Sequence, residues 1–293
     1  MVEDALSAGD VPTVAITGAN RGIGYAVSEE LVRRGYRVVL VTRGAASGAA
    51  AVAALTRVAA GPLPVAVVGD LGTLDGVRAA ADAIRDACPR LDVLVHNAGL
   101  WPSRRVLTPD GVEESFAVNH LAPFLLNHLL EAELAAARAR VVQVSAGIYV
   151  KGRVDLERTP VGADFSGFRT YADTKLCNVL TLPLFAQRWA DRGVTINAVH
   201  PGVIRTGLGA RSGPLGLVLR LAKRRWASPE EGARPIVRLV TEPVGTGGYY
   251  VLDELTPLAG PAADRALAER VWAQAAALTG CAPLLPDSAS EAN

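Results

Sequence analysis

Short apolar runs alternate with segments of helical composition through most of this chain, and this alternation restricts its fold more than any other feature. The runs are continuous, without the period-2 alternation of a half-exposed strand, which is typical of parallel strands covered on both faces. Parallel strands need crossover connections, which the intervening helices supply. We therefore predict an α/β fold, a single Rossmann-type doubly wound parallel sheet of about seven strands with helices on both faces. The expected strands span residues 11–17, 37–42, 64–68, 91–95, 140–145, 195–199 and 248–252.

The remaining segments complete the expected organisation. We predict one domain over residues 11–280, a flexible leader over 1–10 and a flexible tail over 281–293. One long helix is predicted over residues 111–137, with a kink at Pro123. The other helices are expected over residues 25–34, 45–60, 74–87, 171–189, 229–241 and 262–278.

Charge, cysteine content and hydropathy exclude several classes of protein. The formal net charge is +1, which gives no electrostatic reason to bind nucleic acid or an anionic membrane. The three cysteines lack metal-ligand spacing, so we expect reduced thiols and no metal site. No run approaches the length of a spanning helix, and residues 1–10 lack the basic and apolar regions of a secretion signal. We expect a cytoplasmic protein without a membrane span.

Residues 17–24, Thr-Gly-Ala-Asn-Arg-Gly-Ile-Gly, connect the first strand to the first helix. The start of a helix presents free N–H groups and the positive end of its dipole, which favour a phosphate. Gly18 permits the turn, Gly22 lets the backbone approach a pyrophosphate, and Gly24 lets the helix pack closely on its strand. A glycine turn can also serve chain reversal alone. We expect a dinucleotide to bind at Gly18, Asn20, Arg21, Gly22, Ile23 and Gly24.

Further motifs follow the later strands in a definite order. They are Asp70-Leu71, Asn97-Ala98-Gly99, Asn119, Ser145, Tyr171-Ala172-Asp173-Thr174-Lys175, and Pro201-Gly202 with Thr206. In this order and spacing the chain resembles the short-chain dehydrogenase/reductase family over about residues 11–253. Residues 119–126, 171–180 and 247–251 resemble its retinol-dehydrogenase-like branch. The resemblance implies a nicotinamide cofactor.

Four residues are expected to carry the chemistry. Tyr171 and Lys175 lie four residues apart, on one face of a helix. A nearby ammonium should lower the pKa of the Tyr171 phenol, so that it can exchange a proton with a substrate oxygen. Ser145, at the end of a strand, can donate a hydrogen bond to the same oxygen. By resemblance, Lys175 also holds the nicotinamide ribose, and Asn119 holds a water that links Lys175 to solvent.

The end of the second strand indicates which dinucleotide binds. An NAD enzyme places a carboxylate there, whereas this chain has Thr42 followed by Arg43. Arg43 can pair with the 2′-phosphate of NADP(H), and Arg21 adds a second cation, although both arginines could instead be merely solvated. The resemblance adds as cofactor-binding residues Asp70, Leu71, Asn97, Ala98, Gly99, Tyr171, Lys175, Pro201, Gly202, Val203 and Thr206.

Together the motifs predict an NADPH-dependent reductase with Tyr171 as acid and base. It would transfer a hydride reversibly between the nicotinamide and a small hydrophobic ketone, aldehyde or secondary alcohol. The abundance of Ala, Arg and Gly is compatible with a bacterial ketoreductase of secondary metabolism. Two alternatives stay open: a redox-neutral enzyme of the same fold (epimerase, cyclase or dehydratase) and a non-catalytic NADP(H)-binding regulator. The resemblance favours a homodimer or homotetramer.

Substrate contacts are expected from loops that follow strands, because such loops carry specificity in this architecture. The loops span residues 100–105, 147–170 and 203–227, the last as a substrate lid or, alternatively, a membrane-surface helix. The expected apolar wall residues are Trp101, Tyr149 and Leu208. Three histidines are interpreted as structural: His96, His120 and His128. By resemblance His200 lies near the nicotinamide, and it is interpreted as a residue that positions the backbone.

Overall fold

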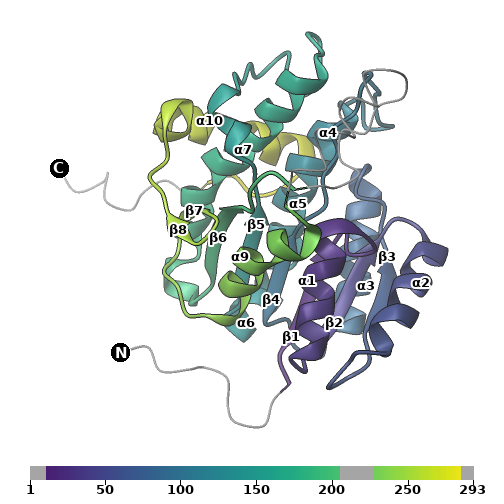
Figure 1. Ribbon diagram of the computed structural model, residues 1–293. Coiled ribbons are helices and arrows are strands. Elements are labelled where there is room, and N and C mark those ends of the chain that lie inside the picture. Colours follow the sequence, from purple (N-terminus) through teal and green to yellow (C-terminus); the bar gives the residue numbers. More distant parts are fainter. Residues whose placement is uncertain (1–10, 205–226, 285–293) are drawn as a thin grey trace.

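The computed structural model describes residues 11–204 and 227–284. Within them, one sheet has the strand order β3-β2-β1-β4-β5-β6-β7-β8 (Figure 1). Strands β1 to β7 are parallel, and β8 pairs antiparallel with β7 at the edge. The bounds are β1 Thr13–Thr17, β2 Arg37–Thr42, β3 Val65–Val68, β4 Val93–His96, β5 Arg140–Val144, β6 Thr195–His200, β7 Tyr249–Val251 and β8 Glu254–Leu255. The predicted parallel sheet is confirmed, with a two-residue strand added.

The strand order reverses direction between β1 and β4, which is where a sheet of this kind binds ligands. β2 and β3 extend from β1 on one side, and β4 to β7 extend on the other. In sheets of this kind the connections after two such strands run to opposite sides, and ligands bind at the carboxyl ends of the strands at this point. Most of the motifs singled out in the sequence follow these ends.

Two layers of helices cover the sheet (Figure 1), and each has its own apolar core. One face is covered by α1 (Gly22–Arg33), α2 (Ala45–Thr56) and α9 (Pro229–Thr241). The other is covered by α3 (Leu74–Ala87), α5 (Ala122–Leu129), α6 (Glu131–Ala137), α7 (Gly167–Arg188) and α10 (Arg265–Thr279). Alternate residues of each strand point to opposite layers, so the fully apolar strands are explained by burial on both sides.

The long helix predicted over residues 111–137 is wrong. The chain there forms α4 (Glu114–Phe116), a π-helical turn η1 (Ala117–Leu121), α5 and α6. Pro123 lies in the first turn of α5, where a missing N–H costs nothing, and not at a kink in a helix interior. The π-helical turn is stabilised from α7, because Asn178 Nδ2 donates to the carbonyl of Asn119 at 2.6 Å.

Other predicted bounds shift by a few residues. The helix that carries Tyr171 begins at Gly167, and α10 begins at Arg265 behind the capping side chain of Asp264. The loop predicted over residues 147–170 contains a 3-10 helix, η2 (Gly147–Lys151). The leader 1–10, lid residues 205–226 and tail residues 285–293 lie outside the described part, and the division into leader, domain and tail stays a prediction.

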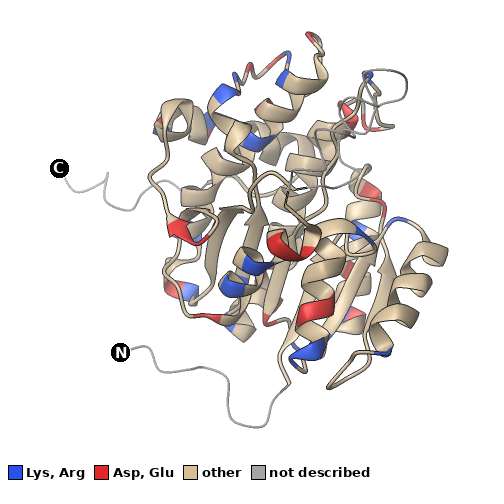
Figure 2. Cartoon of the chain, in the orientation of Figure 1, with Lys and Arg blue, Asp and Glu red and all other residues tan. Residues whose placement is uncertain are grey.

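Figure 2 shows residues of both signs of charge interspersed along the chain, in agreement with the net charge of +1. No helix among the described residues is long and apolar enough to cross a membrane. The three cysteines are free, and Cys88 and Cys177 are buried.

Candidate active site

The glycine turn after β1 has the geometry that its sequence requires. Gly18 and Gly22 have φ of +65° and +58°, a region that favours glycine. A Cβ on Gly18 would lie 3.0 Å from Ala98 Cα, and one on Gly24 would lie 2.6 Å from the carbonyl oxygen of Gly18. The turn therefore excludes side chains at these positions and opens into the N-terminus of α1, where a pyrophosphate would fit.

Asn97, which follows β4, holds this turn in place. Its Nδ2 donates to the carbonyls of Thr17 (2.9 Å) and Gly18 (3.2 Å). In return, Thr17 Oγ1 accepts from the backbone N–H groups of Asn97 and Ala98, both at 3.0 Å. The side-chain amide of Asn97 thus bonds to the turn, and a direct contact with the cofactor stays a prediction.

Two arginines lie at the end where the adenosine ribose is expected. Arg21 directly precedes α1, and Arg43 directly follows β2. Both are exposed, and neither forms an ion pair with another described residue. Thr42 is buried and donates to the carbonyl of Gly44 (3.3 Å), so no carboxylate occupies this strand end. The charges therefore suit an anionic group on the ribose.

Asp70 and Leu71 follow β3 at the same edge of the sheet. Asp70 is exposed, and its Oδ1 accepts from the N–H of Gly72 at 3.0 Å. Leu71 is buried in the core beneath it. One oxygen of Asp70 is therefore held by its own turn, and a contact with adenine stays a prediction.

Lys175 reaches from α7 to the end of β5. Its Nζ donates to the carbonyl of Val144 at 3.0 Å and lies 5.7 Å from the ring centroid of Tyr171. Burial lowers the pKa of Lys175 to about 8. Burial also raises the pKa of Tyr171, which is 7% exposed. This direction is opposite to the one expected from a nearby ammonium, because burial dominates in this arrangement.

Ser145 follows β5 and is buried beside Tyr249 of β7. Its N–H donates to the carbonyl of Val199 at 2.8 Å. The neighbouring Ser145 side chain opposes part of the rise that burial imposes on the pKa of Tyr249. Both hydroxyls are buried, and neither has a hydrogen-bond partner among the described residues. Sequence reasoning did not identify Tyr249 as a site residue, because its place beside Ser145 depends on the order of three strands.

Asn119 joins the π-helical turn to the loop after β4. Its Oδ1 accepts from the N–H of Leu100 (2.7 Å), and its Nδ2 donates to the carbonyl of Leu100 (2.9 Å) and to Thr174 Oγ1 (3.0 Å). A Cβ built on Gly99 would lie 3.5 Å from Asn119 Oδ1 and 3.9 Å from Lys175 Nζ. Asn119 therefore lies near Lys175, and its expected role in holding a water stays a prediction.

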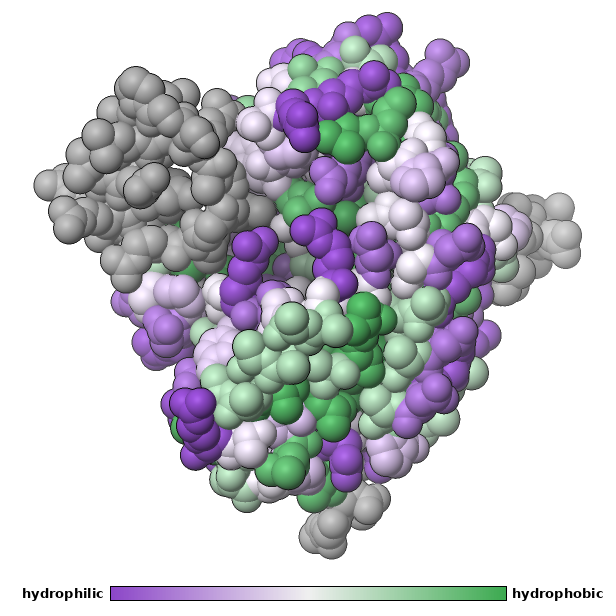
Figure 3. Space-filling model, turned by 90° about the vertical axis from the view of Figure 1, so that its right-hand side faces the viewer, coloured by the Kyte–Doolittle hydropathy of each residue, from purple (hydrophilic) through white to green (hydrophobic). Residues whose placement is uncertain are grey.

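Trp101 covers the catalytic tyrosine candidate. Its ring stacks on that of Tyr171 with centroids 5.1 Å apart, and its centroid also lies 6.4 Å from that of the tilted Phe168 ring. On the side of the molecule that carries α2, Figure 3 shows a hollow in which apolar residues lie between polar ones. Tyr149, also expected on the substrate wall, is instead 3% exposed and packs against Tyr249.

The loop after β6 contributes the last group of site candidates. Pro201 is buried, Gly202 has φ of +91°, and Val203 is exposed. The ring of His200 borders Gly147, since a Cβ there would lie 3.2 Å from His200 Cδ2. Burial lowers the pKa of His200. The predicted site residue Thr206 and the predicted wall residue Leu208 lie outside the described residues.

The remaining histidines have partners within the fold, and His96 and His120 are buried whereas His128 is half-buried. His96 bonds to Asn127 (2.8 Å) and His120 to Asn178 (3.1 Å), and burial lowers the pKa of each histidine to about 4. His128 bonds to the carbonyl of Phe124 at 2.9 Å. In the described part of the chain, His, Cys, Asp and Glu form no group of three that could hold a metal ion.

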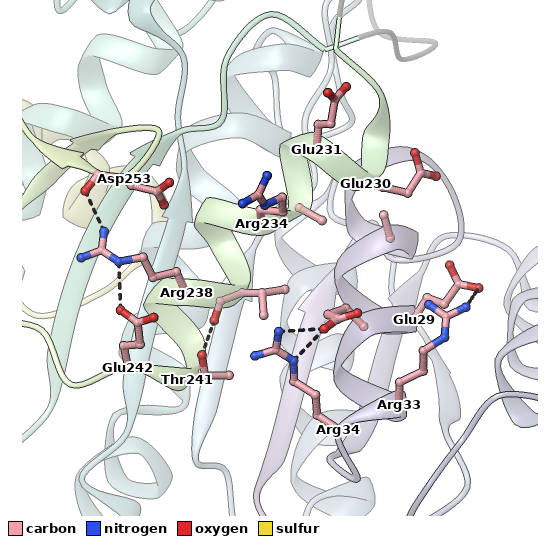
Figure 4. A pocket seen from close by; sticks show the side chains of 14 residues that line it. Glu29, Arg33, Arg34, Glu230, Glu231, Arg234, Arg238, Thr241, Glu242 and Asp253 are labelled. Carbon is pink, nitrogen blue, oxygen red and sulfur yellow. Dashed lines mark hydrogen bonds and ion pairs between the residues drawn. The ribbon is translucent and has the colours of Figure 1, made fainter.

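A second concave region lies between α1 and α9, with a volume of about 750 Å³. Figure 4 shows that charged side chains line it and pair along their own helices, such as Arg33 with Glu29 and Arg238 with Glu242. Exposed pairs of this kind contribute little to stability. None of its lining residues belongs to the candidate site, so this groove is separate from the predicted chemistry.

Comparison with known proteins supplies the family. The model of the short chain dehydrogenase family matches residues 12–214. The chain is 37% identical over 274 residues to a candidate daunorubicin C-13 ketoreductase from Streptomyces sp. (strain C5), covering 92% of each chain. It is 36% identical over 284 residues to human retinol dehydrogenase 14, covering 89% of this chain and 84% of that protein.

A solved structure is similar over most of the chain. It is a candidate NAD(P)-dependent gluconate 5-dehydrogenase from Beutenbergia cavernae, with NADP bound at low occupancy. The TM-score is 0.64 at 27% identity, and the match covers 82% of this chain and 94% of that one.

Proposed function

The chain belongs to the short-chain dehydrogenase family, in its retinol-dehydrogenase-like branch, and from that membership we propose that it is an NADPH-dependent carbonyl reductase. It reduces a hydrophobic ketone or aldehyde and, in reverse, oxidises the corresponding secondary or primary alcohol. The observation that supports this function best is the meeting of Ser145, Tyr171 and Lys175 at the end of β5, where Lys175 Nζ bonds to the carbonyl of Val144. A binding protein without catalysis has no need of all three groups.

The residues of the chain supply the proton and stabilise the developing charge. Tyr171 gives its phenolic proton to the carbonyl oxygen of the substrate as that oxygen gains negative charge. Ser145 donates a hydrogen bond to the same oxygen. Lys175 orients the nicotinamide ribose and, with its positive charge, favours the Tyr171 phenolate that is left behind. A nicotinamide held by these residues would supply the hydride for the carbonyl carbon.

The proposed preference for NADPH rests on the charges around the adenosine ribose. Arg43 and Arg21 would face the 2′-phosphate, and the strand end at Thr42 carries no carboxylate to repel it. The backbone around Gly18, Gly22 and Gly24 leaves room for the pyrophosphate. The NADP bound in the Beutenbergia structure supports the same choice.

The proposed substrates are hydrophobic, because aromatic groups surround the reactive phenol. Trp101 and Phe168 provide an apolar surface next to Tyr171. The names of the two similar proteins indicate an anthracycline ketone and a retinoid as compounds to examine first. We favour a ketoreductase of secondary metabolism, since the ketoreductase relative matches 92% of each chain.

The experiment is a reduction assay with purified protein. NADPH oxidation is followed by absorbance with daunorubicin and with all-trans-retinal, and each is repeated with NADH. Consumption of NADPH in proportion to alcohol formed would support the proposal. A product that forms while the reduced nicotinamide stays constant would instead identify a redox-neutral enzyme of the same fold, and binding without any product would identify a regulator.

The same proposal includes the setting of the enzyme. A cytoplasmic location fits the free thiols of Cys88 and Cys177, which a reducing compartment preserves. A homodimer or homotetramer is proposed from the family. Light scattering coupled to size exclusion would measure the oligomer, and fractionation of the producing cell would test the location.

A further inference from the structure

Tyr249 and Ser145 lie on the same face of the sheet, two strands apart. In the sheet register Gln143 pairs with Ala198, and Ala198 pairs with Tyr249. Ser145 follows Gln143 by two residues and so points to the same face. Ala198, between the two strands, has only a methyl group, which leaves room for the Tyr249 side chain to extend across β6 toward Ser145. Both side chains are buried on this face, and the hydroxyl of each is without a hydrogen-bond partner among the described residues.

The Tyr249 ring is fixed in this direction by its neighbours. It is 2% exposed and packs edge-on against Tyr149, with ring centroids 5.0 Å apart. The Tyr149 hydroxyl accepts from the N–H of Ala259 at 3.3 Å, which ties Tyr149 to the segment after β8. The carbonyl of Tyr249 accepts from the N–H of Thr256 at 2.8 Å. The phenol therefore has little freedom to turn away from Ser145.

Burial also keeps the Tyr249 phenol protonated, so that it can act as a donor. Burial and the neighbouring Tyr149 raise the pKa of Tyr249, and the contact with Ser145 opposes that rise only in part. The phenol consequently keeps its proton at every pH at which the enzyme would work and remains a donor. A serine hydroxyl has one proton to donate and two lone pairs that accept.

On this geometry, and resting on the proposed reductase function, we propose that Tyr249 is a positioning residue for Ser145. In the proposed arrangement its O–H donates to Ser145 Oγ and so gives both partnerless hydroxyls a partner. The single proton of Ser145 then points toward the substrate oxygen and not into the fold. A hydroxyl that accepts a hydrogen bond becomes a stronger donor. Tyr249 thus acts on the reaction only through Ser145, without touching the substrate.

Activity measurements in a double-mutant cycle test this role. Tyr249→Phe removes only the hydroxyl. Because the free energy of one hydrogen bond corresponds to about a ten-fold change in rate, kcat should fall by that factor. KM and the Kd of NADPH should stay constant. In a Ser145→Ala background the same substitution should cost nothing further, because its target is gone. Tyr250→Phe is the matched control, since Tyr250 lies on the opposite face, against Arg238. Equal losses in both backgrounds, or no loss in the first, would overturn the proposal.

A measurement without turnover separates this proposal from the reductase function. Tyrosines carrying ¹³C at Cζ are observed by NMR, and the Tyr249 and Tyr250 signals are identified by their loss in the two Phe variants. Ser145→Ala should shift the Tyr249 signal and leave that of Tyr250 in place. An unmoved Tyr249 signal would refute the contact even in an active enzyme. If it moves while no carbonyl compound is reduced, the contact stands and the proposed function fails.

Discussion

The indole ring of Trp101 lies nearly parallel to the phenol ring of Tyr171, at an interplanar angle of 12° and a centroid distance of 5.1 Å. Asn119 fixes the loop that makes this contact, because it bonds to both backbone groups of Leu100. The stacked indole is one reason why Tyr171 is buried and why its pKa is raised. The loop after β4 therefore affects both the proposed substrate surface and the proposed proton donor.

We expect Trp101→Ala to weaken substrate binding more than chemistry. A stacked aromatic pair contributes about 0.5–1.5 kcal/mol beyond area burial, so KM for a hydrophobic ketone should rise several-fold. Trp101→Phe keeps an aromatic surface, so its KM should lie between that of Trp101→Ala and that of the wild type. Steady-state kinetics with a large and a small ketone provide the measurement. A KM unchanged for both would show that Trp101 is not part of the substrate wall.

Tyr171→Phe should abolish most turnover while NADPH binding stays within a few-fold. In the proposed mechanism the phenol provides the proton, and general acid catalysis contributes about 10²–10⁴-fold to the rate. The ring and its stacking on Trp101 are retained, so the fold should tolerate the change. Single-turnover absorbance and a fluorescence titration with NADPH give the two values. Retention of most of kcat would remove Tyr171 from the mechanism.

Lys175→Ala should damage both cofactor affinity and rate. The ammonium bonds to Val144 and lies near Tyr171, so its loss affects the ribose site and the proton donor together. Lys175→Met keeps the length of the side chain and controls for packing. Kd for NADPH and kcat are measured for both variants. An unchanged Kd would contradict the ribose role of Lys175.

Arg43→Ala should reduce the affinity for NADPH and hardly alter that for NADH. A charge-assisted pair with a phosphate contributes about 1.5–3 kcal/mol, which corresponds to about one to two decades in Kd. Adding Thr42→Asp should extend the loss, because the carboxylate repels the phosphate. Titrations of each variant with both cofactors measure this. Equal losses of affinity for NADPH and NADH would indicate damage to the fold. A wild type that binds NADH more tightly than NADPH would overturn the NADP assignment.

Asp173 should make stability depend on pH. Burial raises its pKa from 3.8 to about 6, although the N–H of Arg153 donates to it at 2.7 Å. The folded state therefore favours the protonated carboxyl. The contribution of the protonated Asp173 carboxyl to the stability of the fold is complete below pH 3.8. It is lost as the pH rises through about 6.

Comparison of the wild type with Asp173→Asn measures this contribution. The free energy of unfolding of the wild type, relative to the variant, should fall by at most about 3 kcal/mol between pH 4 and 6. Urea unfolding at several pH values gives the two curves. A constant difference across this range would show that Asp173 titrates normally in the folded protein.

The sequence was sufficient for features that depend on local spacing. Tyr171 and Lys175 could be placed on one helix face by their separation, and the glycines of the first turn by the strand and helix beside them. The parallel sheet followed from continuous apolar strands. These inferences need only neighbouring residues and simple periodicities.

Features that depend on three-dimensional register could not be read in the same way. The sequence pattern around residues 117–121 fits a period of 3.6 residues, so it predicts a continuous α-helix. The structure has a π-helical turn there instead. Tyr249 comes near Ser145 only because β6 lies between their strands and carries Ala198 at the crossing. The pKa of Tyr171 depends on burial by Trp101, a loop residue whose position no periodicity describes.

The two hydrogen bonds from Asn97 Nδ2 to the turn after β1 have a kinetic consequence. Because they link segments 80 residues apart, the phosphate cradle takes its shape when the sheet forms and not when a nucleotide arrives. Nearly every molecule is then ready to bind, and the apparent affinity carries no penalty for selecting a rare conformer. Cofactor association should be a single fast phase whose rate is proportional to NADPH concentration, without the plateau that a preceding rearrangement imposes.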